Sequence, residues 1–186
     1  MKFWPQEKTR NQSGLSVLEL LIILSAIAIV VLISTPASTM ILEKYRAKTA
    51  YASLLSGLEL AIGEAQKRSS TVRVCPSSNG HTCRADGNWN LGWLVYSDGN
   101  NNRTVQDIEL IQAFEAPHQS VRITAWGAVE STASFTATGL VETADAKTGR
   151  FKICLRGSDT PPRVVNINEE GWVELVPGHN EVCESS

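Results

Sequence analysis

The sequence has little net charge and lacks the residue spacings that build zinc sites. Its 17 basic side chains nearly balance 19 acidic ones, which gives a formal charge of −2 over 186 residues. This balance excludes attraction of nucleic acid or anionic lipid over the whole surface, so any such binding needs a local patch. The four cysteines and three histidines show neither C-x2-C nor H-x3-H spacing, which argues against structural zinc. We expect no metal and no cofactor.

Signatures of an enzyme are also missing. His81, His118 and His179 lie in polar, turn-like or proline-flanked contexts, without a nucleophile elbow or a triad pattern. The sequence has no internal repeat and no low-complexity linker. Its length and bulk composition predict one domain of ordinary size with an additional segment. We therefore expect a folded protein without catalytic activity.

An apolar run sets the amino-terminal end apart. Residues 1–14 carry three basic side chains against one acidic, and residues 15–33 contain a single charge, Glu19. At about 1.5 Å per residue, this run would extend roughly 28 Å, about one hydrocarbon thickness. The basic flank precedes the run, so the positive-inside rule leaves the amino terminus in the cytoplasm and sends the remaining chain across the membrane. No A-x-A-like cleavage site follows Ile33, which predicts a retained single span instead of a secretory signal.

Glu19 needs a partner if it lies inside a membrane, where a carboxylate costs about 3 kcal/mol on insertion scales. Alternatively, it lies at the cytoplasmic edge and reaches water. Residues 14–21 (GLSVLELL), after a short basic leader, resemble the class III signal of type IV pilins and type II secretion pseudopilins, with Leu15 where that family more often has Phe. The resemblance implies cleavage by a prepilin peptidase between Gly14 and Leu15 and N-methylation of Leu15. It also implies that Glu19 pairs with the amino terminus of a neighbouring subunit during assembly.

Beyond Pro36 the pattern predicts a long helix followed by strands. Apolar residues recur at helical spacing to about Ser69, and Pro36 is expected to kink or loosen the helix. Gly57 and Gly63 lower its intrinsic propensity, so it should depend on packing against a sheet. From Thr71, short apolar runs alternate with turn residues, which is typical of strands. Strands are expected at 71–75, 91–96, 108–114, 121–125, 133–136, 151–155, 163–167 and 171–176.

All four cysteines follow the apolar run, on the side of the membrane expected to be oxidising. An even number there favours disulfides, and four cysteines allow three connectivities. The C-x7-C spacing of Cys75 and Cys83 indicates a closed surface loop, which leaves Cys154 to fasten the tail at Cys183. We predict disulfides between these two pairs.

Four segments of the carboxyl-terminal half resemble the GspH/FimT family of minor pilins and pseudopilins. They are residues 89–100 (WNLGWLVYSDGN), 135–139 (FTATG), 151–154 (FKIC) and 163–167 (RVVNI), the last followed by Gly171. The arrangement of Cys154 and Cys183 is especially similar to FimU-type members. The resemblance implies an α+β, type IV pilin-like fold, in which a long amino-terminal helix packs on an antiparallel two-sheet β domain.

The resemblance also implies a division of the chain and a role for each part. The expected parts are a leader peptide (1–14), a transmembrane and polymerisation helix (15–35), an amphipathic half-helix (36–69) and a periplasmic β domain (70–186). The implied function is that of a minor pilin in a tip complex that primes pilus assembly. Its expected partners are other minor pilins, the major pilin, the prepilin peptidase and the inner-membrane assembly platform. The alternatives are a GspH-like pseudopilin of type II secretion and a FimT-like DNA receptor for natural transformation.

One loop resembles a calcium site in part. Asp98, Asn100, Asn102 and Glu109 occupy positions one, three, five and twelve of an EF-hand-like loop. Arg103 stands where the loop requires glycine, and strands flank the segment in place of helices. A hairpin turn rich in Asp, Gly and Asn is therefore the favoured interpretation.

The DNA-uptake motif of FimT-type relatives, Gly-Arg-x-Arg in the last strand, is not matched here. The corresponding residues 171–174 read GWVE, which removes both phosphate-neutralising arginines. Residues 149–152 (GRFK) resemble the motif in letters, but they precede the Cys154 strand and are interpreted as a solvated turn. Trp172 could stack on a base, although packing is the commoner role. We therefore do not expect DNA as a partner.

Overall fold

The computed structural model describes residues 16–142, 148–158, 160–168, 170–178 and 183, without the side chains of residues 32–40 and 177. Its helix α1 (Val17–Arg68) precedes a series of strands. The chain divides into two compact units, Met1–Met40 and Ile41–Ser186, which we describe separately. The helical range of α1 includes Pro36, so the proline does not end the helix.

Local signals explain where α1 begins and ends. Ser16 caps its first turn, because the Ser16 hydroxyl accepts a hydrogen bond from the Leu18 amide at 3.3 Å. At the other end, Ser69 adopts a left-handed conformation with φ of 50°, and the Ser70 amide donates to the Ala65 carbonyl at 3.2 Å. This is the hydrogen bond of a Schellman motif, which stops a helix while satisfying a terminal carbonyl. The expected end near Ser69 is confirmed.

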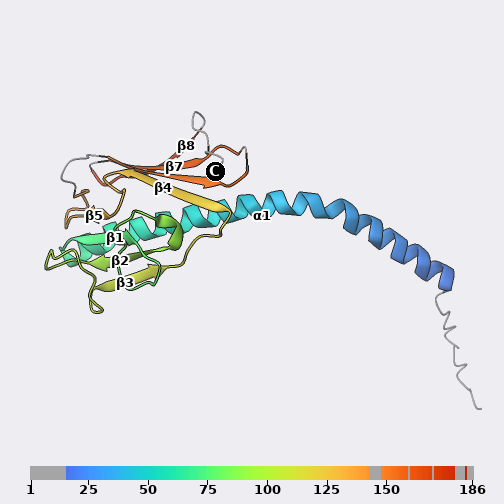
Figure 1. The fold of residues 1–186 in the computed structure, drawn as a ribbon, viewed down its shortest axis with the longest axis horizontal. Coiled ribbons are helices and arrows are strands. Elements are labelled where there is room, and N and C mark those ends of the chain that lie inside the picture. Colours follow the sequence, from blue (N-terminus) through green and yellow to red (C-terminus); the bar gives the residue numbers. More distant parts are fainter. Residues whose placement is uncertain (1–15, 143–147, 159, 169, 179–182, 184–186) are drawn as a thin grey trace, which may run out of the picture. The chain divides into compact units, whose positions relative to one another are not determined.

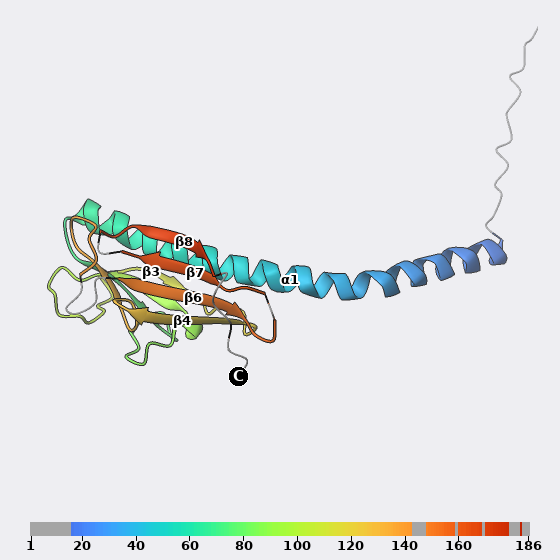
Figure 2. The same ribbon diagram turned by 90° about the horizontal axis from the view of Figure 1, so that it is seen from above.

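The second unit contains two antiparallel sheets of four strands each. The first sheet has the order β3-β2-β1-β5, and the second has the order β4-β6-β7-β8. Figure 1 shows the later turns of α1 lying between these two layers, and Figure 2 shows the strands of the second sheet side by side. The strands are β1 (Val72–Pro76), β2 (Trp93–Ser97), β3 (Leu110–Phe114), β4 (Val121–Gly127), β5 (Ala133–Phe135), β6 (Gly149–Leu155), β7 (Arg163–Ile167) and β8 (Val173–Pro177).

Each expected strand has a counterpart, which confirms the α+β architecture. Several boundaries differ from the expected ones by one or two residues, and two of these differences have a local cause. The strand expected at 91–96 begins at Trp93, because a short 3-10 helix, η1 (Trp89–Leu91), precedes it. Residues 149 and 150 form the start of β6 and are not a turn, since Gly149 pairs with Gly127 and Arg150 pairs with Trp126 of β4.

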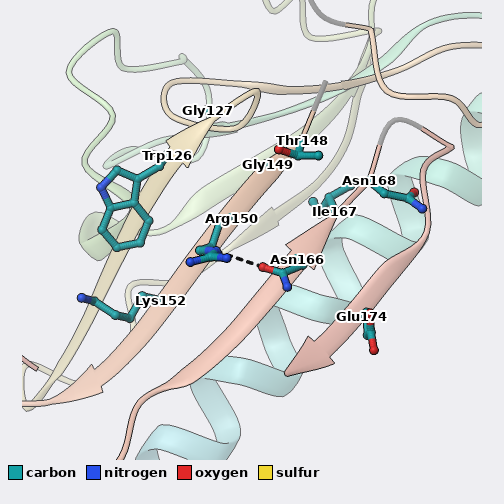
Figure 3. A pocket seen from close by; sticks show the side chains of 10 residues that line it. All are labelled: Trp126, Gly127, Thr148, Gly149, Arg150, Lys152, Asn166, Ile167, Asn168 and Glu174. Carbon is teal, nitrogen blue, oxygen red and sulfur yellow. Dashed lines mark hydrogen bonds between the residues drawn. The ribbon is translucent and has the colours of Figure 1, made fainter. Parts of the chain in front are cut away.

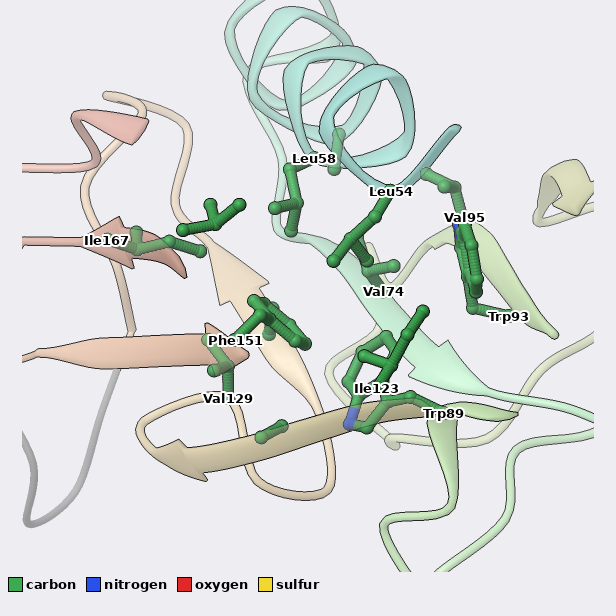
Figure 4. Close-up of a cluster of buried hydrophobic side chains, with 14 of the residues drawn as sticks. Leu54, Leu58, Val74, Trp89, Trp93, Val95, Ile123, Val129, Phe151 and Ile167 are labelled. Atoms are coloured by element: carbon green, nitrogen blue, oxygen red, sulfur yellow. The ribbon is translucent and has the colours of Figure 1, made fainter. Parts of the chain in front are cut away.

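The later turns of α1 supply one wall of the hydrophobic core. Ala50, Leu54, Leu58, Ala61 and Ala65 are at most 3% exposed, and their spacing of three or four residues places them on one face of the helix. Figure 4 shows Leu54 and Leu58 facing the inner side chains of both sheets. These buried side chains agree with the expectation that this half of the helix depends on packing against a sheet.

Gly57 shows how closely α1 approaches the first sheet. A Cβ atom on Gly57 would lie 2.9 Å from Nε1 of the fully buried Trp93. Trp93 in turn stacks on Phe114, with ring centroids 5.7 Å apart. The glycine therefore lowers helix propensity but allows the indole ring to lie directly against the helix backbone.

The segment around η1 joins the two sheets. Trp89 is fully buried, its Nε1 donates to the Glu130 carbonyl at 3.0 Å, and its ring meets Phe151 edge-on at 4.9 Å. Asn90 hydrogen-bonds both backbone groups of Ile123, accepting from its amide at 2.7 Å and donating to its carbonyl at 3.1 Å. These contacts satisfy the outward-facing backbone groups of Ile123 at the edge of β4 and hold the second sheet against the segment that leads into β2.

Candidate functional site

The amino-terminal part of α1 exposes apolar side chains on all sides. The large apolar residues from Val17 to Val31 are 44–75% exposed within the chain. A helix that is apolar all round is stable when other helices or lipid cover it. Glu19 lies exposed in the first turn of this helix. The positive end of the helix dipole favours a carboxylate there.

The structure leaves two expectations about the amino-terminal segment untested, namely its processing and its membrane span. Gly14 and Leu15 lie outside the described residues, so cleavage and methylation remain predictions. In the described part of the chain, no helix has both the length and the hydropathy of a membrane span. The span expected over residues 15–35 also remains a prediction.

Both expected disulfides are present. Cys75 pairs with Cys83 and Cys154 pairs with Cys183, with Cα atoms 5.5 Å and 5.7 Å apart. The first closes a loop over the outer face of the first sheet, where Cys75 is buried with Leu94. The second joins β6 to the tail. All four cysteine sulfurs are therefore bonded to sulfur and are not available as nucleophiles or metal ligands.

A buried arginine organises the outer face of the first sheet. Arg73 of β1 is only 4% exposed, and its Nε donates to the Asp98 carboxylate at 2.6 Å. Its other nitrogens donate to Ser134 Oγ at 2.6 Å and Asn101 Oδ1 at 2.7 Å, and one pairs with Glu142 at 3.0 Å. A buried charge with this many hydrogen bonds fixes the segments that supply its partners.

Burial raises the pKa of the neighbouring Tyr96 to about 12, so its hydroxyl stays neutral beside these charges.

This arrangement explains the loop that resembles a calcium site. The Asp98 carboxylate accepts hydrogen bonds from the backbone amides of Asn102 at 2.9 Å and Arg103 at 3.1 Å, besides the bond from Arg73. Cationic and amide donors thus occupy the oxygens that a calcium ion would coordinate. Among the described residues, no three or more His, Cys, Asp or Glu side chains gather to hold a metal.

A row of four side chains crosses the outer face of the second sheet. Strand pairing places Trp126 of β4 opposite Arg150 of β6, Arg150 opposite Asn166 of β7, and Asn166 opposite Glu174 of β8. Figure 3 shows these four side chains pointing to the same face. They line part of a pocket of about 720 Å³, together with Lys152, Asn168, Thr148 and Ile167.

The pocket residues contact one another. Arg150 Nε donates to Asn166 Oδ1 at 3.1 Å, and the Lys152 ammonium lies 5.2 Å from the centre of the Trp126 ring. Gly149 permits close packing below this row, since a Cβ atom there would lie 2.5 Å from a Val129 methyl group. The row therefore stands on a closely packed sheet, with part of the Trp126 ring, 40% exposed, open to solvent.

The structure also places both segments compared with the DNA-uptake motif. Arg150 and Glu174, from segments 149–152 and 171–174, belong to the same row, two strands apart. Trp172 precedes β8 and is 71% exposed, so its side chain is not part of the core. Arg150 and Glu174 are far apart in the sequence, so their proximity became evident only from the order of the strands.

Sequence reasoning missed Arg73, Trp126 and Asn166. The signal for Arg73 was available, because a lone arginine inside the apolar run VRVC requires a partner if the strand is buried on both faces. No comparable signal existed for Trp126 and Asn166, which lie 40 residues apart in the sequence.

Residues 50–171 match the family described as type II transport protein GspH. The chain belongs to the GspH family. This GspH-family chain resembles the Pseudomonas aeruginosa type IV minor pilin FimU, with a TM-score of 0.56, 19% identity, and coverage of 77% of this chain and 96% of FimU. It also resembles the Vibrio cholerae type 2 secretion minor pseudopilin EpsH, with a TM-score of 0.51, 12% identity, and coverage of 72% and 98%. No curated protein matches it significantly.

These likenesses show that the GspH-family chain shares its fold with a type IV minor pilin and with a type II secretion minor pseudopilin. At identities of 12% and 19%, the solved structures establish the shared fold. The family match covers the later turns of α1 and both sheets as far as Gly171. It therefore includes the core and the Arg73 cluster, whereas the apolar part of α1 lies before it.

Proposed function

We propose that this protein is a non-enzymatic minor pilin of a type IV pilus, which joins a tip complex that primes pilus assembly. The observation that supports the proposal is the apolar, exposed stretch from Val17 to Val31 with Glu19 in its first turn, attached to a GspH-family β domain. Such a helix needs neighbours that cover it, and a fibre of parallel helices provides them.

The proposed mechanism is packing. A prepilin peptidase removes residues 1–14, and the new amino terminus at Leu15 is methylated. Residues 15–33 then hold the subunit in the inner membrane as a single span, with the β domain in the periplasm. On assembly, the apolar helix moves from lipid into contact with the helices of other minor pilins and the major pilin. Glu19 pairs there with the terminal ammonium of an adjacent subunit, which compensates its charge.

A pseudopilin of type II secretion is the main alternative, since the fold is shared with EpsH as well as FimU. Both functions require the same apolar helix and the same fold. The test must therefore determine whether the protein is located in surface fibres. We would express a carboxyl-terminally tagged chain in its host, shear the surface fibres and probe them for the tag. Presence in sheared pili that depends on Glu19 supports the pilus function. Retention in the envelope together with a secretion defect on deletion favours the pseudopilin.

Processing at Gly14 is the first prediction of this proposal. Replacing Gly14 with Val should leave residues 1–14 attached, because the peptidase requires a small residue before the cleaved bond. Mass spectrometry of the membrane-associated protein measures this directly, and Glu19→Ala serves as the matched variant that alters the neighbouring helix. A wild-type protein that retains Met1 in its mature form would contradict the pilin proposal.

DNA binding provides a second prediction and separates this proposal from an uptake receptor. The full-length chain should bind duplex DNA weakly at physiological salt, since Glu174 lies where the uptake motif has an arginine. Replacing both Trp172 and Glu174 with Arg should steepen the dependence of log affinity on log salt by about two units. Fluorescence anisotropy at several salt concentrations measures the slope. Tight wild-type binding that Arg150→Ala abolishes would favour the DNA receptor.

A further inference from the structure

We infer that the free edge of β8 binds an extended, basic segment of a partner protein, which adds to the second sheet as an antiparallel strand. This inference goes beyond the proposed assembly function, because the apolar part of α1 takes no part in it. It starts from the order of the sheet, in which β8 lies at one end and no described strand lies beyond it. An unpaired strand edge presents backbone donors and acceptors with which another chain can pair.

The hydrogen bonds at the two ends of β8 show which of its backbone groups face β7. The Asn168 amide donates to the Trp172 carbonyl at 3.2 Å, and the Gly178 amide donates to the Pro162 carbonyl at 3.1 Å. In an antiparallel pair, every second residue of a strand bonds to the neighbouring strand. The even-numbered residues of β8 therefore bond to β7, and the odd-numbered ones face away from it.

The outward-facing amides and carbonyls of β8 belong to Val173 and Leu175. No contact in the described part of the chain satisfies them. Pro177 continues the same alternation, and proline is tolerated on the open side of an edge strand because that side needs no amide hydrogen. The edge thus offers two adjacent donor and acceptor pairs to an incoming strand.

The other three sheet edges differ from that of β8. At the edge of β4, Asn90 hydrogen-bonds both outward-facing backbone groups of Ile123. At β5, the Glu142 amide donates to the Ser134 carbonyl at 2.8 Å, so the segment after β5 covers that edge. Strand β3 has a register shift against β2, and such irregularity makes an edge less suitable for pairing. Among the described strands, β8 is therefore the regular edge without a cover.

The side chains of β8 indicate what the added strand carries. Glu174 points to the outer face of the sheet (Figure 3). Glu174 and Glu170, in the turn before β8, are exposed and form no ion pair with another described residue. A cation directly opposite Glu174 stabilises a strand pair, so we expect lysine or arginine there. Leu175 is 40% exposed and Val173 packs against the core, so apolar side chains fit opposite these two residues.

A second copy of this chain fits the edge less well than a basic partner. If Val173 of one copy paired with Leu175 of the other, Glu174 would lie directly opposite Glu174 of the second copy. Like charges in that position destabilise a strand pair. An acidic partner segment is disfavoured for the same reason.

Fluorescence anisotropy of a dye-labelled, capped octapeptide, VTVKVTVK, tests the inference on the full-length chain in a zwitterionic detergent, with empty micelles as the blank. We expect this peptide to bind, and its acidic form VTVEVTVE to bind about threefold or more weakly. N-methylation of the two central valines, whose amides face β8 in the antiparallel register, should weaken binding about tenfold or more. N-methylation of the lysine and threonine that follow these valines should weaken binding much less, because their amides face solvent.

Amide hydrogen exchange locates the bound peptide. The amides of Val173 and Leu175 should exchange about tenfold or more slowly with the peptide present. Those of Glu174 and Val176 should change little, because they already bond to β7. Neither measurement requires a pilus, so failure of this inference and failure of the proposed assembly function can be distinguished.

Glu174→Lys is the informative variant, since it should reverse the preference between the basic and the acidic peptide. Glu115→Lys is its matched control, because it makes the same change at an exposed carboxylate that follows edge strand β3. It should leave the preference unchanged. The N-methylated peptides leave the protein unaltered, so they keep the inference testable if Glu174→Lys fails to fold.

Four results would overturn the inference. The first is that VTVKVTVK does not bind, and the second is that methylation of lysine and threonine weakens binding as much as methylation of valine. The third is that Glu115→Lys alters the preference as Glu174→Lys does. The fourth is protection of Val173 and Leu175 that rises with protein concentration without peptide, which would identify a second copy as the occupant.

Discussion

Replacing Arg73 with Met should lower the free energy of unfolding by about 3–5 kcal/mol, the range for breaking a buried ion pair by removing one partner. Asp98 is 1% exposed and would remain as a buried carboxylate without its cation. Ser134, Asn101 and Glu142 would each lose a contact as well. Chemical denaturation monitored by tryptophan fluorescence measures the change, since Trp89 and Trp93 are buried in the same unit.

An exposed ion pair provides the matched control. Arg84 pairs with Asp86 at 2.5 Å, but both side chains are more than a third exposed. Arg84→Met should therefore change the free energy of unfolding far less than Arg73→Met does, because solvent screens the exposed pair. The double variant Arg73→Met with Asp98→Asn should be less destabilised than the sum of the single changes, because the uncompensated charge is removed. Equal effects of Arg73→Met and Arg84→Met would show that burial does not govern the Arg73 contribution.

Opening the Cys154–Cys183 disulfide should lower the free energy of unfolding by about 3–4 kcal/mol in the chain-entropy model. The bond closes a sequence separation of 29 residues, against 8 for Cys75–Cys83. Cross-linking restricts the unfolded chain more when the closed loop is longer. Cys154→Ala combined with Cys183→Ala, studied by denaturation under non-reducing conditions, tests this value.

The single change Cys183→Ala separates the cross-link from the packing of Cys154, which is 7% exposed. Cys183→Ala opens the same loop, so it should account for most of the stability that the double variant loses. Peptide mapping without reduction checks the pairing itself. A fragment that links Cys83 to Cys154 would contradict the connectivity, and a double variant as stable as the wild type would contradict its energetic role.

Local patterns were sufficient for the helix and the strands. Apolar residues that recur every three to four positions indicate a helix, and short apolar runs between turn residues indicate strands. Both patterns depend on neighbours within a few residues. The end of α1 near Ser69 and the approximate position of each strand therefore followed from the sequence. The errors lay where tertiary contacts outweigh local preference. Gly149 and Arg150 suggest a turn by composition, yet pairing with β4 extends β6 over both residues.

The cysteine pairs were also within reach of sequence reasoning. Cys75 and Cys83 are close enough in the chain to favour one another, and this leaves Cys154 and Cys183 as the second pair. Loop-closure entropy depends on sequence separation, which is visible without a structure.

Two features were decided by the tertiary structure alone. The sequence favoured a turn over a calcium ion at Asp98 but did not identify Arg73 as a partner of its carboxylate, and the packing of β1 beside the loop after β2 supplies that partner. The row on the second sheet brings together Trp126, Arg150, Asn166 and Glu174 from four separate strands. Strand order and register are set by long-range pairing and by burial of the opposite face, so residues tens of positions apart become neighbours only when the sheet forms.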